Sequence, residues 1–179
     1  MIRLLALCCF FVGFSQPKEP VILWTDAVNL SWSNFIAQPD STSGAVAVTA
    51  SGIVFSFSVN TNNDNVIGFK TEVKSQFYPN KSWYKKNQVD AHVLAHEQLH
   101  FDITELFARK FRKRISQVKI SNKVRDRLNA IHETILKELA NFQNQYDNET
   151  DYSRNKDKQL QWQKRVRDEL KELSQFKLE

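Results

Sequence analysis

The chain has 179 residues and a formal net charge of +5, and hydrophobic residues make up 41% of it. Its basic residues are mostly interleaved with acidic ones, and no nucleic-acid-binding motif is present, so we expect no nucleic-acid partner. About 160 residues remain after the apolar start discussed next, which is enough for one domain with a packed core.

Residues 1–16 have the pattern of a secretory signal peptide. Arg3 precedes a short apolar run, which ends in small and polar residues before Pro17. The run is too short for a transmembrane helix, which needs about 20 apolar residues. Both cysteines, Cys8 and Cys9, fall within it, so the mature chain would be exported without disulfides. We therefore expect a periplasmic or extracellular protein, with no stable membrane insertion once the signal is removed.

The first half of the mature chain has the periodicity of strands. An aromatic-rich opening at 21–36 predicts a short strand. From Ile53 to Asn60, apolar and polar residues alternate, and a second alternating run follows over 67–77. Between them, residues 62–65 read Asn-Asn-Asp-Asn, a sequence that favours a turn. The two runs predict a hairpin in an antiparallel sheet with one face toward solvent; Ile67 is expected on its apolar face.

The second half predicts three helices. Residues 89–115 contain neither Gly nor Pro, and their apolar residues recur three or four positions apart. Ser121 could cap a second helix that ends at about Gln145. Residues 146–154 break the pattern, and a last helix carries Leu160 to Leu173. The fold class expected for residues 17–179 is therefore a single α+β domain, with an N-terminal antiparallel β-sheet followed by three long helices.

The first of these helices carries the sequence His96-Glu97-Gln98-Leu99-His100, which fits the HExxH pattern. Residues four apart lie on one face of a helix, so both imidazoles can reach one Zn²⁺ ion. Glu97 lies beside them and could act as general base toward a water that the metal acidifies. The motif predicts a zincin-like site with His96 and His100 as metal ligands and Glu97 as the catalytic residue.

Several residue blocks resemble a bacterial family of secreted proteins that are predicted to be zinc-dependent proteases and are catalogued as a domain of unknown function. The resemblance implies one secreted domain with a zincin-like architecture. The sequence departs from the family pattern at Asn34, where an Asp is expected, and at Tyr152, where many relatives have a His. The blocks that carry the resemblance are 30–35, 47–53, Ser82-Trp83, 94–105, Tyr146-Asp147 with Thr150, and Gln159 with Trp162.

A catalytic zinc site generally has three protein ligands. The resemblance points to Tyr152 as the third, since that position holds the relatives' additional His. A zinc-bound phenol can ionise because the metal favours its charged form. Glu149, Asp151 and His132 are alternatives. For the second shell, Asp102, Glu105 and His92 are candidates because they lie on the same helix as the motif.

The function expected from these features is that of a secreted zinc metallopeptidase acting on protein or peptide substrates. One alternative is a non-catalytic envelope binding or scaffolding domain, whose zinc site is structural or lost. Another is a zinc hydrolase that acts on a non-peptide bond, such as an amide in the cell wall. The sequence leaves the substrate and the oligomeric state open.

Overall fold

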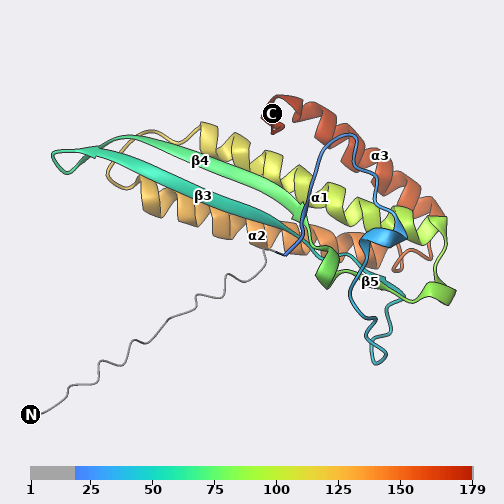
Figure 1. The fold of residues 1–179 in the computed structure, drawn as a ribbon. Helices are drawn as coiled ribbons and strands as arrows, with labels where there is room; N and C mark the ends of the chain where they lie inside the picture. The colour runs from blue at the N-terminus through green and yellow to red at the C-terminus, as the bar shows by residue number, and fades with distance from the viewer. Residues whose placement is uncertain (1–18, 179) are drawn as a thin grey trace, which may run out of the picture.

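The computed structural model describes residues 19–178 and has the expected α+β order of elements (Figure 1). The predicted signal peptide lies outside the described residues. Short 3₁₀ turns occur at Trp32–Asn34, Pro79–Lys81, Lys86–Gln88 and Ser174–Phe176. The strands are β1 (Ile22–Leu23), β2 (Ala47–Val48), β3 (Ser51–Asn62), β4 (Asn65–Phe77) and β5 (Trp83–Tyr84), and the helices are α1 (Ala91–Ser116), α2 (Val124–Glu149) and α3 (Lys156–Glu172).

The predicted hairpin is confirmed. β3 and β4 pair antiparallel with Phe55 opposite Val73, and β1 pairs with the other edge of β4. Asn63 and Asp64 form the turn in the left-handed region, at φ 46° and 62°, which Asn and Asp tolerate better than most residues. The hairpin lies along α1 and α2 as a long, narrow ribbon (Figure 1).

The expectation for Ile67 was wrong. Asn60 pairs with Gly68 and Thr61 with Val66, so Ile67 is the extra residue of a β-bulge. A bulge interrupts the alternation of side chains between the two faces. Ile67 is consequently 58% exposed, whereas Val73 and Phe77, past the bulge, are buried as predicted.

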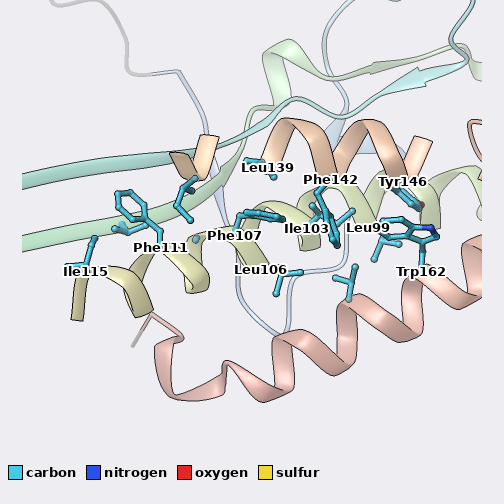
Figure 2. Close-up of a cluster of buried hydrophobic side chains, with 14 of the residues drawn as sticks. Leu99, Ile103, Leu106, Phe107, Phe111, Ile115, Leu139, Phe142, Tyr146 and Trp162 are labelled. Atoms are coloured by element: carbon cyan, nitrogen blue, oxygen red, sulfur yellow. The ribbon is translucent and has the colours of Figure 1, made fainter. Parts of the chain in front are cut away.

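α1 is the central element of the domain. It begins at the N-cap Asp90, whose side chain accepts a hydrogen bond from the backbone N–H of Val93 (2.9 Å). One side of α1 contacts the hairpin, and other sides contact α2 and α3. Figure 2 shows the core that results, in which residues of α1 meet Leu139, Phe142 and Tyr146 of α2 and Trp162 of α3.

α2 extends further than the sequence analysis predicted. Phe142 and Tyr146 continue its apolar stripe, and Tyr146 is fully buried against Trp162 (Figure 2). This burial keeps the helix regular to Glu149. The chain then leaves the helix through Asp151, Tyr152 and Ser153, all of which have positive φ. The boundary at Gln145 was therefore wrong by one helical turn, and the cap is Lys123 rather than Ser121.

A second small sheet adjoins the helix that carries the motif. β2 pairs antiparallel with β5, with Ala47 opposite Tyr84. Just after β2, the hydroxyl of Thr49 donates to the backbone carbonyl of Glu97 (3.1 Å) and so attaches this sheet to α1. Within residues 19–178, no helix combines the length and the apolarity that crossing a bilayer requires.

Candidate metal centre

Three side chains from two helices converge at one point. The Nε2 atoms of His96 and His100, one turn apart on α1, lie 3.2 Å from each other. Oδ1 of Asp147, near the end of α2, lies 3.2 Å from His96 Nε2 and 2.9 Å from His100 Nε2. These three residues form a group whose ligand atoms could hold one metal ion.

The spacing of these atoms fits a tetrahedral metal. Ligand atoms about 2.1 Å from a tetrahedral Zn²⁺ are separated by about 3.4 Å from each other. The observed separations of 2.9–3.2 Å are slightly shorter. Two imidazoles and one carboxylate are also a common set of protein ligands for catalytic zinc, and they leave a fourth position open. The residues present therefore fit this metal.

In the absence of a metal, Asp147 and His100 stabilise each other's charged forms. Burial alone would raise the pKa of Asp147, but hydrogen bonds from His100 and His96 keep it well below its usual range. Burial would lower the pKa of His100, yet the hydrogen bond to Asp147 and the charge of Glu97 raise it overall. Without a metal, the centre is thus an ionised carboxylate stabilised by imidazole donors.

Gln143 fixes the orientation of His100. Its Oε1 contacts Nδ1 of His100, and its Nε2 donates to the backbone carbonyl of the same residue (3.0 Å). If Nδ1 donates its proton to Gln143, the lone pair of Nε2 is free for a metal, as is usual for ligating histidines. His96 lacks such support, since its buried Nδ1 has no hydrogen-bond partner among residues 19–178.

Tyr146 forms one wall of the centre. Its ring stacks on that of His96, with centroids 4.5 Å apart, and it makes an edge-to-face contact with the ring of His100, with centroids 5.0 Å apart. Burial, together with the negative charges of Glu97 and Asp147, raises the pKa of the phenol far above its usual value. Tyr146 therefore stays neutral, and it restricts the rotamers of both histidines.

Glu97 is buried next to this group of side chains. It is 4% exposed, and its Oε2 has no hydrogen-bond partner among the described residues. Burying a carboxylate oxygen without a hydrogen-bond partner costs free energy, and a catalytic function would explain why this cost is retained. Glu97 lines a cavity of about 710 Å³ together with His96, His100 and Asp147. The predicted catalytic residue and both predicted histidines thus share one cavity wall.

Tyr152 lines the same cavity, but its side chain is 59% exposed. The structure shows no hydrogen bond between its hydroxyl and either His96 or His100, and it brings Asp147 to the two histidines. The role of Tyr152 as a ligand stays a prediction.

The alternatives for the third ligand have other partners. Glu149 accepts from the indole N–H of Trp162 (2.9 Å), and Asp151 pairs with Arg154 (2.7 Å). His132 stacks on Phe111 in the core.

The three residues of α1 that were candidates to support the motif histidines have other partners. Asp102 accepts from Trp24 and Gln98, and Glu105 pairs with Arg109 and Arg112. The Nε2 atom of His92 lies 2.6 Å from the carbonyl oxygen of Ser153. His92 therefore attaches the turn after α2 to α1.

Sequence reasoning missed Asp147 as a candidate, although a usable signal was present. Phe142 and Tyr146 continue the spacing of the α2 stripe past Gln145. A helix that continues this far places Gln143 and Asp147 four residues apart, on one face, next to the buried Tyr146. That face is the one that meets the histidines.

The family profile described as "Bacterial protein of unknown function (DUF922)" matches residues 29–155. The matched region includes the motif, Gln143, Asp147 and Tyr152. No curated protein and no solved structure shows significant similarity to the chain.

Proposed function

This chain belongs to the DUF922 family of bacterial proteins of unknown function, and we propose that it is an exported, zincin-like zinc metallopeptidase. The observation that carries the proposal is the convergence of His96, His100 and Asp147 beside the buried, unpartnered carboxylate oxygen of Glu97. This combination is more than metal binding alone requires, because a purely structural site has no use for a free buried base.

Each residue has a separate role in this proposal. His96, His100 and Asp147 would hold the zinc ion. When bound, the ion would act as a Lewis acid that polarises the substrate carbonyl and lowers the pKa of water. Glu97 would accept a proton at Oε2 from the attacking water and deliver it to the leaving amine. Gln143 would keep His100 in the tautomer and orientation that binding needs.

The edge of β2 supports a peptide as the substrate. The carbonyl of Val46 accepts a hydrogen bond from the N–H of Lys85 (2.8 Å), so the backbone groups of Val46 and Val48 point toward β5. By the alternation of an antiparallel ladder, the backbone groups of Ala47 point to the other edge. Residues 44–49 line the same cavity as Glu97. An extended peptide could add to this edge through its main chain, which would position its scissile bond near the centre.

The zinc content and the peptidase activity of three purified proteins test the proposal; mass spectrometry detects cleavage of unstructured peptides. Wild type should carry about one zinc per chain, and His100→Ala should lose it. Glu97→Gln should retain the metal but lose the hydrolysis of these peptides. His132→Ala removes a histidine remote from the centre and should retain both properties. A wild type without metal under zinc-replete conditions would favour the non-catalytic envelope domain. Zinc-loaded wild type that cleaves a cell-wall amide but no peptide would favour a zinc hydrolase that acts on a non-peptide bond.

Export is the remaining part of the proposal and rests on the pattern of residues 1–16. N-terminal sequencing of the protein from its native host should give a start near Ser15 to Pro17. A soluble protein that retains Met1 would contradict it.

A further inference from the structure

A second cavity, of about 560 Å³, lies on the side of α1 opposite the candidate metal centre. It is bounded by residues 24–29, by α1, and by α3 with the residues that follow it. At about 100° per residue, Gln98 and Asp102 point away from His96 and His100. Figure 1 shows the first described segment, in blue, crossing α1 toward α3. The body of α1 therefore separates the two cavities.

Arg109 is a buried cation on the wall of this cavity, and its side chain is 4% exposed. Its Nε donates to Glu105 (2.9 Å), and its Nη1 donates to the carbonyl of Leu170 (2.6 Å). Its guanidinium lies over the ring of Trp24, 5.1 Å from the centroid. Buried Nη2 has no hydrogen-bond partner among residues 19–178. Oδ1 of Asp26 lies 3.8 Å from it, beyond hydrogen-bond length.

The carboxylates around Arg109 neutralise its charge only in part. Glu105 is shared between Arg109 and Arg112, so this buried group carries one surplus positive charge. Asp26 is exposed and is held by Lys177. The lining as a whole contains four basic residues and two acidic ones: Arg109, Arg167, Lys171 and Lys177 against Asp26 and Asp102. A buried donor with unbalanced charge is a ready site for an anion.

The rest of the lining selects the kind of anion. Val28, Leu99, Val166 and Leu170 supply apolar surface, which suits a ligand with a hydrocarbon body. We propose that this cavity binds a small organic carboxylate, whose oxygen accepts from Nη2 of Arg109 and whose apolar part packs between α1 and α3. One carboxylate charge matches the single surplus charge of the buried group. The site does not depend on the metal centre.

Hexanoate is a suitable probe, and hexanamide is its neutral match. Calorimetry on the purified protein should detect binding of hexanoate but not of hexanamide or inorganic phosphate. In NMR spectra, hexanoate should shift the indole N–H signal of Trp24, which lies against the Arg109 guanidinium. Equal binding of hexanamide, binding of phosphate alone, or no binding of hexanoate would overturn the proposal.

Two variants locate the site. Arg109→Gln should weaken hexanoate binding by about tenfold or more, because a charged donor is lost. Lys164→Gln removes the same charge from an exposed position of α3 and should leave the affinity unchanged. If Arg109→Gln does not fold, Asp26→Asn remains informative. It removes the carboxylate nearest Nη2 in the cavity and should tighten binding about two- to fivefold. Unchanged or weaker binding in Asp26→Asn would contradict the proposal.

Discussion

At the residue scale, the candidate centre depends on one carboxylate that sequence reasoning did not select. Asp147 Oδ1 lies within hydrogen-bond distance of both motif histidines and is held ionised by them. Tyr152 lies in the turn after α2 and is mostly exposed. The two residues differ in what they would contribute: Asp147 offers a charge at neutral pH, whereas a phenol must first be ionised by the metal.

Substitution of these two residues should identify the third ligand. We expect Asp147→Asn to weaken zinc binding by at least about tenfold, because the amide removes the negative charge and keeps the shape. Tyr152→Phe should leave the affinity within about twofold of wild type. Competition with a chromophoric chelator measures both. The reverse order of effects would support Tyr152 as the third ligand, and equal large losses would indicate that both residues bind the metal.

Gln143 provides a second test at the same scale, because it touches no metal in the proposal and acts through His100. Gln143→Leu should weaken zinc binding by about tenfold, since the imidazole loses the acceptor for its Nδ1 proton. Gln145→Leu, two residues along α2 and exposed, is the matched control. Gln143→Glu should restore binding, because a carboxylate accepts the same proton. Full affinity in Gln143→Leu would show that packing against Tyr146 is sufficient to orient His100.

At the scale of elements, the sequence predicted the long, periodic segments and the short strand within 21–36, which is β1, but it missed β2 and β5. The alternation of β3 and β4 and the stripe of α1 are local patterns, and each specifies a face. β2 and β5 contain two residues each, and their pairing joins positions far apart in the chain, so no periodicity could reveal them. The same applies to Ile67, since the bulge results from pairing with the opposite strand and not from its own neighbours.

The site divides in the same way. His96, Glu97 and His100 were predictable because a single helix fixes their relation. Asp147 was predictable only in part. The spacing of Phe142 and Tyr146 indicates that α2 continues past Gln145, but the way in which α2 crosses α1 depends on tertiary packing, such as that of Tyr146 against Trp162, which local propensity does not contain.

At the scale of the whole molecule, one buried ionic group connects most of the layers. Glu105 of α1 accepts from Arg109 Nε (2.9 Å) and Arg112 Nη1 (3.0 Å). Arg112 also donates to the carbonyl of Val73 on β4 and to that of Phe176 after α3, while Arg109 donates to Leu170 on α3. The hairpin, α1 and the C-terminal segment are therefore joined through one carboxylate.

Removal of this charge should destabilise the whole domain. Glu105→Gln preserves the shape but removes the counter-charge that buried Arg109 and half-buried Arg112 share, so we expect the free energy of unfolding to fall by about 3–5 kcal/mol. Asp168→Asn breaks the exposed pair with Lys164 and should change it by less than about 1 kcal/mol. Urea unfolding of the three proteins measures the difference. A loss in Glu105→Gln no larger than in Asp168→Asn would mean that water or relaxation compensates the two arginines, and that the apolar core alone holds the layers together.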